Sequence, residues 1–600
     1  MRSWRLSGAP APTSGAGSRP FVRRRIGQAL GQARALGLAL GLGLASLGAQ
    51  ALGCRTATPA EAAVYTLPQL MPGVTSPRDG TCFIGGLKVP GSDGTLLSAN
   101  VFLPRQDPNG ARAPGVMFIS SWAAADFFEY VGQQQRLAQQ GYVAFAYTAR
   151  GFWGSEGTVG VAGPADVADA SAMLDWISAN TPADPQRLAS AGISYGAGLS
   201  LLAAAKDGRI KAVVAMSGWA ALIEQMYRNE VPNPIWLDIL QLSGQLTGRL
   251  DPLVANYNSL LQNPDTPAAR ISEIATWAWA RSPSSGLPQL NARQVPVMLV
   301  KNWQDDMFSP NSSMALFAQL TGPKKLLLQS GIHASAELPG AVLGVDQHIW
   351  TQAQRWLARW LKNEANGIDT EPKVDLQPKF AGYREQLSNW PAPELKTQAL
   401  YLQPRGAVRW DWRCVCTRGW TGGLGSAPSG DTVSDRIGNA LDTTASSGPL
   451  PVLSPLMESV GLPVINHQAT ILWGNGIRYE GDWLRSPLKL RGIPSLQLRV
   501  KPSQARGMAV AYLYDVDAAG FGTLITHGAR AWHQAQPGQV MTLNLDLVAT
   551  AYDAPAGHYL ALVLDTRDPL YGPPVRAGES FEYSLEFAPG QTQRLTLQSR

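Results

Sequence analysis

The stretch Leu188-Ala189-Ser190-Ala191-Gly192-Ile193-Ser194-Tyr195-Gly196-Ala197-Gly198 joins an apolar run to a run of small residues. Leu188–Ile193 is typical of a buried strand, and Ala197–Ala205 of a helix. Between them, residues 192–196 form the chain's one Gly-x-Ser-x-Gly pattern. So tight a strand-to-helix turn needs nearly side-chain-free residues two before and two after the serine, and it raises the hydroxyl above the sheet at the positive end of a helix. The alternative is an ordinary glycine-rich turn with a surface serine.

Strand-like apolar runs alternate with helical patterns on both sides of this stretch, from about residue 90 to residue 365. The expected strands are Leu96–Phe102, Val116–Ser120, Val143–Tyr147, Leu188–Ile193, Ala212–Met216, Val295–Lys301 and Lys325–Gln329. Helical patterns lie near residues 127–139, 163–180, 197–206 and 344–362. This alternation predicts an α/β domain over residues 75–368, in which helices cover both faces of a mostly parallel sheet.

Two segments depart from the alternation. Ala220–Pro283 has helical periodicity, many Leu and Trp residues and frequent Pro, and it falls between two expected strands. It predicts a helical cap, about residues 218–290, over the C-terminal edge of the sheet. From residue 376 to 592, short strands separated by Gly, Pro and Asp turns predict an all-β domain, a sandwich or jelly roll. Asp369–Pro378 is the expected linker.

A serine hydroxyl needs a base before it becomes an effective nucleophile. Of the six His residues, only His333 and His348 fall in the α/β region. His333 follows the last expected strand, on a loop past the sheet, where a base for Ser194 belongs. His348 lies inside the amphipathic stretch Gly344–Leu361, which favours a packing or helix-surface role.

The base in turn needs a carboxylate that fixes its tautomer and stabilises its charged form. Asp305 and Asp306 follow the expected strand Val295–Lys301, so the chain order is serine, acid, histidine. We favour Asp305 as the orienting acid. Asp306 has an alternative role as the cap of a helix that starts near Pro310.

An acyl-transfer site also needs donors that meet a developing oxyanion. The backbone N–H of Tyr195 is the first candidate, because the residue after the nucleophile lies at the helix start. The second should come from the loop after Val116–Ser120, at Ser121 or Trp122. Which atom donates stays open, since Trp122 and Tyr130 are equally suited to line a pocket.

The N-terminus predicts export. Residues 1–54 contain seven Arg and no Asp, Glu or Lys, and Arg23–Arg25 precede the uncharged apolar stretch Ala35–Gly48. Small residues at Ala49 and Ala51 suit a signal peptidase. The Arg cluster resembles a twin-arginine signal, and residues 51–54 resemble a lipobox with Cys54 as the lipid acceptor. We therefore expect a periplasmic or secreted protein, with a lipoprotein as the alternative.

The remaining composition excludes several classes of function. Without its N-terminal arginines the chain carries about −1 in place of its formal +6, so it has no basic surplus for binding nucleic acid. Cys54, Cys82, Cys414 and Cys416 fit no zinc spacing, and no metal or organic cofactor is indicated. The apolar stretch near the N-terminus is too short for a membrane span. Disulfide pairing among the cysteines cannot be assigned from the sequence.

Several motifs together resemble one family, the Xaa-Pro dipeptidyl-peptidase (peptidase S15) and cocaine-esterase-like hydrolases. The similar stretches are Ala149-Arg150-Gly151-Phe152-Trp153-Gly154-Ser155-Glu156-Gly157, Gly192–Gly196, Asp184-Pro185-Gln186-Arg187, Leu513-Tyr514-Asp515-Val516-Asp517 and Thr526-His527-Gly528-Ala529. The resemblance covers about residues 80 to 590. The chain departs from the family at Thr148, where an Asp is usual, and at Asn302, where a Gly is common. It has no clear equivalent of the oxyanion tyrosine.

The resemblance implies an α/β-hydrolase domain, a helical cap, a C-terminal β domain and a triad at Ser194, Asp305 and His333. It implies cleavage of esters, amides or proline-containing peptides through an acyl-enzyme. A dipeptidyl-peptidase would need an acidic anchor for the substrate amine, for which Glu129, Glu224 and Glu230 are candidates.

An alternative from another class is a non-catalytic protein that binds carbohydrate or polymer on a hydrolase scaffold. Its sugar-stacking residues would be Trp410, Trp412, Trp420, Trp473, Trp483 and Trp532. The presence of all three triad members argues against it.

Overall fold

The computed structural model describes residues 54–59, 73–406, 409–411, 416–418, 421–438 and 442–600. The predicted targeting segment before Cys54 lies outside the described residues, as do Cys414, Trp412 and Trp420. The described chain from residue 54 onward belongs to one compact unit. None of its helices is both long enough and apolar enough to span a bilayer.

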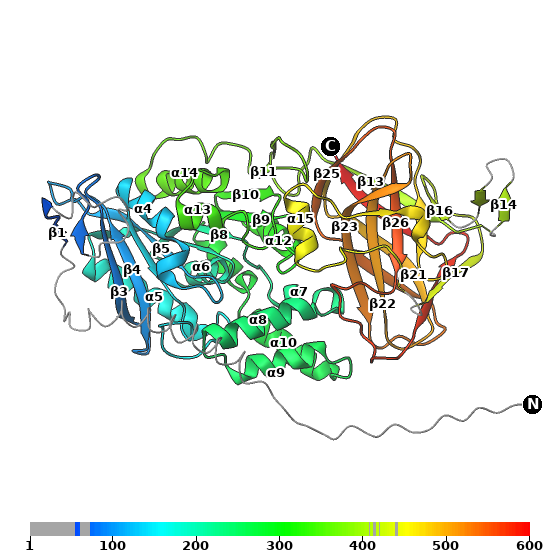
Figure 1. The fold of residues 1–600 in the computed structure, drawn as a ribbon, viewed down its shortest axis with the longest axis horizontal. Helices are drawn as coiled ribbons and strands as arrows, with labels where there is room; N and C mark the ends of the chain where they lie inside the picture. Colours follow the sequence, from blue (N-terminus) through cyan, green and yellow to red (C-terminus); the bar gives the residue numbers. More distant parts are fainter. Residues whose placement is uncertain (1–53, 60–72, 407–408, 412–415, 419–420, 439–441) are drawn as a thin grey trace, which may run out of the picture. The chain divides into compact units, whose positions relative to one another are not determined.

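The first domain is built on a 12-stranded sheet within the described residues (Figure 1). In spatial order its strands are β1 (Arg55–Thr56), β2 (Val74–Thr75), β3 (Cys82–Pro90), β4 (Leu96–Leu103), β6 (Val143–Tyr147), β5 (Ala113–Ile119), β7 (Ala183–Ile193), β8 (Ile210–Met216), β9 (Val297–Asn302), β10 (Lys324–Gln329), β11 (Val374–Leu376) and β12 (Glu385–Leu387). In this spatial order, every neighbouring pair of strands from β6 through β5 to β11 is parallel. This confirms the mostly parallel sheet.

The two faces of this sheet bury two separate apolar clusters, because successive side chains of a strand point to opposite faces. In β5, Met117 and Ile119 join one cluster, while Val116 and Phe118 join the other. The first cluster includes residues of α5 (Pro164–Asn180), α6 (Tyr195–Lys206) and α12 (Pro310–Gln319). The second includes residues of α4 (Val131–Gln139), α13 (Leu338–Leu343) and α14 (His348–Lys362). Helices therefore cover both faces, as the sequence predicts.

A helical cap is inserted between β8 and β9 and is coloured green in Figure 1. It consists of α7 (Ile223–Met226), η1 (Arg228–Glu230), α8 (Pro234–Thr247), α9 (Pro252–Gln262), α10 (Ala268–Trp279), η2 (Pro283–Gly286) and α11 (Leu287–Ala292). Both α8 and α9 begin with a Pro, and the side chains of Asn233 and Asp251 cap them. The Trp122 indole N–H donates to the Leu240 carbonyl at 3.0 Å, which attaches α8 to the loop after β5.

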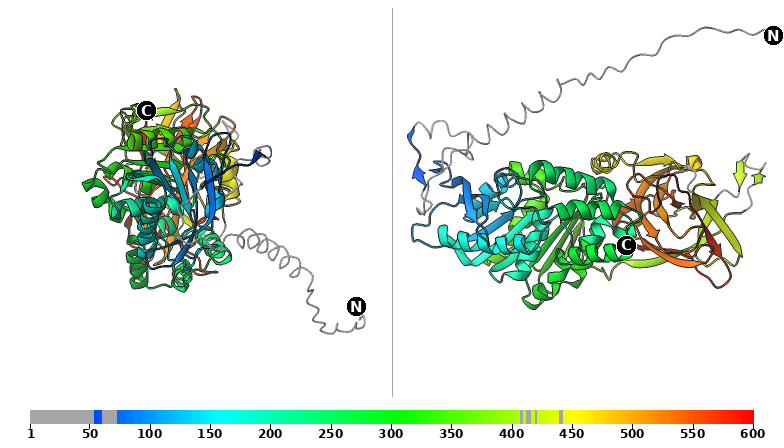
Figure 2. Two further views of the ribbon diagram at one scale, coloured as in Figure 1. Left: turned by 90° about the vertical axis from the view of Figure 1, so that its left-hand side faces the viewer. Right: turned by 90° about the horizontal axis from the view of Figure 1, so that it is seen from below.

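The second domain is a largely antiparallel β-sandwich, which confirms the predicted all-β domain. Its strands are β13 (Lys396–Gln403), β16 (Thr421–Gly425), β17 (Val433–Gly438), β18 (Ile465–His467), β19 (Ile477–Glu480), β20 (Leu488–Gly492), β21 (Ser495–Pro502), β22 (Gly507–Val516), β23 (Phe521–Trp532), β24 (Met541–Asp546), β25 (Thr550–Ala554), β26 (Tyr559–Asp565), β27 (Glu582–Phe587) and β28 (Arg594–Ser599), with the separate hairpin β14 (Arg409–Asp411) and β15 (Cys416–Arg418). The views in Figure 2 show these strands wrapped around a common interior. That interior is filled by its own apolar cluster.

Two short strands, in and just after the expected linker Asp369–Pro378, extend the first sheet. Strand β11 pairs in parallel with β10, and β12 pairs antiparallel with β11, so both belong to the first sheet. The first strand of the second sheet is β13. The sequence pattern misses this because β11 and β12 are three residues each, too short to show a period.

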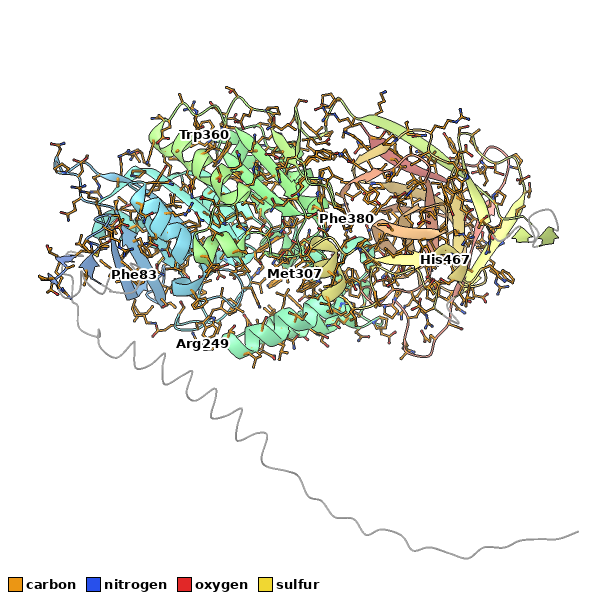
Figure 3. All side chains as sticks on the ribbon, turned by 45° about the horizontal axis from the view of Figure 1, so that its top comes forward. Phe83, Arg249, Met307, Trp360, Phe380 and His467 are labelled. Carbon is orange, nitrogen blue, oxygen red and sulfur yellow. A yellow bond between two sulfur atoms is a disulfide. The ribbon has the colours of Figure 1, made fainter. Side chains whose placement is uncertain are left out.

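Polar side chains and backbone groups join the two domains beside the loop that follows β9. Asn311, in the first turn of α12, donates from Nδ2 to the Leu547 carbonyl and accepts from the Ala549 N–H, both at 2.8 Å. Lys379 forms a buried ion pair with Glu458 at 2.7 Å. Side chains fill the space between the two sheets in Figure 3, and the label of Met307 marks this region. The second domain therefore supports the loop between β9 and α12.

A disulfide joins Cys54 to Cys82, the first residue of β3. It ties the start of the described chain to the first sheet and settles one pairing that the sequence left open.

We expect Asn311→Ala to destabilise the protein by about 1–3 kcal/mol, because the Ala549 N–H loses its acceptor in a part-buried position. Differential scanning calorimetry would show a lower midpoint. Gln319→Ala, at an exposed position of the same helix, serves as the control. Equal midpoints for the two variants would contradict a supporting role for the contact.

Candidate active site

Ser194 lies at a sharp turn between β7 and α6. Its backbone has φ 55° and ψ −114°, a region that is strained for any residue with a side chain. Gly192 and Gly196 make the turn possible, because a Cβ on Gly196 would meet the Ile119 carbonyl oxygen at 1.9 Å and one on Gly192 would meet Gly196 at 2.4 Å. The turn therefore requires the two glycines that flank the serine in the sequence.

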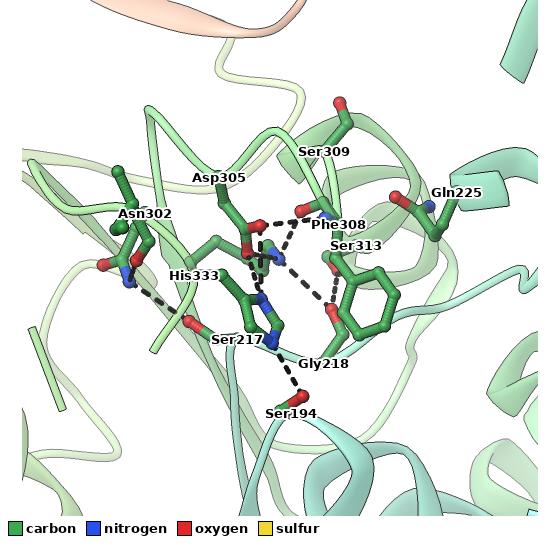
Figure 4. A network of polar contacts seen from close by, with 12 residues as sticks. Ser194, Ser217, Gly218, Gln225, Asn302, Asp305, Phe308, Ser309, Ser313 and His333 are labelled. Carbon is green, nitrogen blue, oxygen red and sulfur yellow. Dashed lines mark hydrogen bonds and ion pairs between the residues drawn. The ribbon is translucent and has the colours of Figure 1, made fainter. Parts of the chain in front are cut away.

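His333 lies on the loop after β10, as expected, and its Nε2 is 2.7 Å from Ser194 Oγ (Figure 4). Its Nδ1 faces Asp305, at 3.2 Å from Oδ1 and 3.1 Å from Oδ2. Strands β7, β9 and β10 are parallel, so the loops that follow them emerge at the same edge of the sheet. This edge brings together three side chains that are far apart in sequence.

Asp305 is fully buried and is held on several sides. It accepts from the Phe308 N–H at 2.8 Å and pairs with Lys301 Nζ at 3.0 Å. Burial by itself would raise the pKa of Asp305, but the charges of Lys301 and His333 and its hydrogen bonds lower that pKa to about 2. Asp305 therefore stays ionised at neutral pH and can orient the imidazole.

Lys301 also belongs to the site, although it lies outside every catalytic motif of the sequence. It is the next-to-last residue of β9 and is 1% exposed. Its Nζ donates to Asp305 and also to the carbonyls of Gly218 and Phe308, at 3.2 and 2.5 Å. The sequence signal is a lysine at the end of a buried apolar strand, four residues before the acid. A lysine is rarely buried without a charged partner, so this position predicts an ion pair.

A second buried network holds the histidine loop. Asn302 donates from Nδ2 to the Ile332 carbonyl at 3.0 Å and to Glu337 Oε2 at 3.0 Å. Ser217 donates to Glu337 Oε1 at 2.6 Å. Burial raises the pKa of Glu337, and these hydrogen bonds act against that rise. Asn302 thus fixes the loop that carries His333, which gives this departure from the family pattern a structural role.

Asp306 and His348 lie elsewhere. The N-cap of α12 is Ser309, whose Oγ accepts from the Asn311 N–H, so the capping role considered for Asp306 is wrong. Asp306 instead faces the second domain, where its Oδ1 is 3.8 Å from His527 Nε2. His348 pairs with Asp375 at 2.8 Å on the outside of the first domain, in keeping with a packing role.

The three candidate oxyanion donors, Tyr195, Ser121 and Trp122, differ in whether their N–H groups already donate to another protein group. The Tyr195 N–H lies at the start of α6, beside Ser194. The Ser121 N–H donates to buried Glu129 at 2.7 Å, and the Trp122 indole N–H donates to α8. Within the described residues, the Trp122 backbone N–H has no hydrogen-bond partner in the structure. This leaves the backbone N–H groups of Tyr195 and Trp122 as the available pair.

A cavity opens beside Ser194 beneath the cap. Tyr195, Trp122, Trp219 and Phe308 line it on the side of the sheet. Helices α8, α9 and α10 contribute most of the opposite wall, including Leu237, Leu240, Tyr257, Leu261, Ile274, Trp277 and Ala278. Among the described residues that line the cavity, none carries a charge.

Arg150, from the stretch that resembles the family motif, has a structural contact. It pairs with buried Asp169 through Nε and Nη2, both at 2.7 Å, and with Asp93 at 3.1 Å. The motif thus fixes the loop after β6 to α5 and to the turn between β3 and β4. Phe152 of the same stretch packs edge-on against Trp122 and Tyr195, with ring centroids 4.9 and 6.1 Å apart.

The strand-turn-helix serine, the histidine that faces it and the buried aspartate define a serine hydrolase of the α/β-hydrolase fold. A family model for the X-Pro dipeptidyl-peptidase (S15 family) matches residues 93–335. A second, for the X-Pro dipeptidyl-peptidase C-terminal non-catalytic domain, matches residues 366–598. The chain belongs to the S15 family, as its motifs predict. Comparison with curated proteins gives no match.

Several solved structures share this two-domain fold. An α-amino acid ester hydrolase is 16% identical, with a TM-score of 0.66, over 91% of this chain and 100% of that one. An aminopeptidase from a marine sediment Thaumarchaeota archaeon is 16% identical, with a TM-score of 0.62, over 86% and 95%. A CocE/NonD family hydrolase from Staphylococcus aureus is 13% identical, with a TM-score of 0.61, over 86% and 94%. At these identities the likeness concerns the fold.

We expect Glu129→Gln to change how stability depends on pH. Burial raises the pKa of Glu129 to about 7, from 4.5 when unfolded, although the Ser121 hydrogen bonds oppose the rise. Between these values the folded protein holds a proton that the unfolded chain releases, so this group lowers stability as pH rises from 4.5 to 7. Urea unfolding of both proteins should show the wild type losing about 3 kcal/mol relative to the variant over this interval. If the free energies of unfolding of the two proteins changed equally between pH 4.5 and pH 7, this expectation would be wrong.

Proposed function

We propose that this protein cleaves ester or amide bonds through an acyl-enzyme on Ser194. The observation that best supports this proposal is the 2.7 Å distance between Ser194 Oγ and His333 Nε2. Asp305 contacts the other nitrogen of the same imidazole, Nδ1. His333 takes the hydroxyl proton as Ser194 Oγ attacks the substrate carbonyl carbon. We assign the stabilisation of the resulting oxyanion to the backbone N–H groups of Tyr195 and Trp122, because no other group in the described part of the chain accepts a hydrogen bond from the Trp122 N–H. His333 then gives the proton to the leaving oxygen or nitrogen as its bond to carbon breaks.

The second half of the reaction uses the same groups in reverse. Water enters where the leaving group departed and gives a proton to His333 while its oxygen attacks the acyl carbon. The bond to Ser194 Oγ breaks, the proton returns to the serine, and the acid is released. Because Asp305 has a pKa of about 2, it remains charged throughout this cycle above about pH 4. Its charge stabilises the imidazolium that forms in both halves.

Within this class, the structure favours an esterase or acylase over a dipeptidyl-peptidase. A dipeptidyl-peptidase needs a carboxylate that binds the free amine of its substrate. Glu129 is committed to Ser121, Glu230 pairs with Arg530 at 2.6 Å, and Glu224 lies exposed on α7. None of the three lines the cavity beside Ser194.

The binding-protein alternative receives less support. Of the tryptophans suggested for sugar stacking, Trp473 and Trp483 are exposed, whereas Trp532 is buried in the β domain. Trp483 packs edge-on against Tyr559, so its ring is partly engaged. The hydrogen-bonded arrangement of Ser194, His333 and Asp305 has an evident use in hydrolysis and none in binding alone.

We expect Ser194→Ala to lower kcat for p-nitrophenyl acetate by at least about 10⁴-fold and to abolish labelling by a fluorophosphonate. Ser272→Ala, at an exposed position of α10, is the matched control. Wild-type enzyme should hydrolyse the ester with a higher kcat/KM than Gly-Pro-p-nitroanilide. Undiminished turnover in Ser194→Ala would show that Ser194 is not the nucleophile. A higher kcat/KM for the anilide would favour the dipeptidyl-peptidase alternative.

We also propose that the chain is exported, to the periplasm or beyond the cell. The basic and apolar N-terminus supports this, and so does the disulfide between Cys54 and Cys82, because disulfides persist in oxidising compartments. The pairing also favours a mature chain that retains Cys54 with its sulfur bound to Cys82 in place of a lipid.

Expression of the full chain, cell fractionation and non-reducing peptide mapping would test export. We expect a product that is shortened before Cys54, lies outside the cytoplasm and contains the Cys54–Cys82 peptide pair. A full-length cytoplasmic product would contradict export. A lipid on Cys54 together with a free Cys82 thiol would support the lipoprotein alternative.

A further inference from the structure

We propose that the cavity beneath the cap binds an unbranched apolar acyl chain, so that the preferred substrates are esters of carboxylic acids longer than butyric acid. This inference rests on the proposed function, because it concerns the acyl group that Ser194 would accept. It assigns the cap a role in specificity, through residues of α8, α9 and α10.

Most side chains in the wall of the cavity are apolar. Leu237 and Leu240 extend from α8, Leu261 from α9, and Ile274 from α10, while Trp219 lies towards the sheet. Burial of each CH2 group of a substrate against such a wall releases it from water, which favours binding.

Tyr257, Asn258 and Gln241 are the polar cap residues in the same wall, and each takes part in a hydrogen bond to another protein group. The Tyr257 hydroxyl donates to Glu273 at 2.8 Å. Asn258 donates from Nδ2 to Gln241 Oε1 at 2.5 Å and to the Leu237 carbonyl at 3.3 Å. A charged or strongly polar acyl group would lose its water here and gain little in return, which costs free energy. The wall therefore selects against amino acids and for hydrocarbon.

The position of His333 indicates which half of the substrate enters the cavity. The leaving group must depart beside the imidazole, because His333 Nε2 protonates it. The cavity is lined by Ser194, Tyr195 and Trp122, on the side of the oxyanion donors, and His333 does not line it. The acyl group, which stays bound to Ser194 Oγ, is thus the half that faces the cavity.

The far end of the cavity limits the useful chain length. Leu261 lines both this cavity and a neighbouring cleft between the cap and the β domain. That cleft has a mixed lining, in which the charged or polar side chains of Asp265, Arg506 and His533 lie among prolines. Carbon atoms that pass Leu261 would leave the uncharged wall and gain less from burial. The activity should therefore rise with chain length and then level off.

The test is kcat/KM for p-nitrophenyl esters from acetate to decanoate, on the purified mature chain. We expect a rise of up to about fourfold for each CH2 group buried, followed by a plateau or decline. Fluorophosphonate labelling is measured on the same samples. A fall in kcat/KM from acetate onward, with labelling intact, would overturn this inference and leave the proposed function standing. Neither labelling nor hydrolysis of any ester would instead refute the proposed function.

Variants in the cap locate the effect. Ala278→Phe fills part of the cavity from α10 and should lower the ratio of octanoate to acetate activity by at least about tenfold, the loss of two buried CH2 groups. Ile274→Ala widens the cavity and should move the maximum to longer chains. Ala269→Phe, at an exposed position of α10, is the matched control and should change neither. If Ile274→Ala and Ala278→Phe, both still labelled by fluorophosphonate, keep the wild-type chain-length profile, the cavity is not the acyl site.

Discussion

The contact between Ser194 Oγ and His333 Nε2 depends on a single geometric constraint, the shared edge at which parallel strands end. Ser194 follows β7, Asp305 follows β9 and His333 follows β10, so three short loops meet although they span 139 residues of chain from the serine to the histidine. The strained turn at Ser194 exists only because β7 and α6 are held by the packed sheet on either side. The rest of the molecule serves to hold these loops in place.

Much of that support is electrostatic and buried. Lys301 places a positive charge against Asp305, and Asn302 links the histidine loop to Glu337. A buried carboxylate without such partners would take up a proton and lose its ability to stabilise the imidazolium. The β domain adds a further layer, because Leu547 and Ala549 bind Asn311 directly after the acid loop. A domain without candidate catalytic residues thus contributes to their positions.

The cap supplies most of the uncharged wall of the cavity beside Ser194. The triad explains how a bond is broken, and such triads act on many substrates. The uncharged wall from α8, α9 and α10 is the observation on which the proposed preference for apolar acyl groups, over substrates with a free amine, depends. The solved structures at 13–16% identity share the fold and do not assign a substrate to this chain.

The sequence by itself determined the alternation of strands and helices, the serine turn and the order of serine, acid and histidine. These are local signals, because periodicity and turn chemistry act over a few residues. Only the tertiary structure decided between Asp305 and Asp306, assigned the cap of α12 to Ser309, added Lys301 and Glu337, and placed β11 and β12 in the first sheet. Each of these depends on contacts between segments distant in the chain. Adjacent aspartates are equivalent in sequence and differ only in which neighbour the fold brings to each of them.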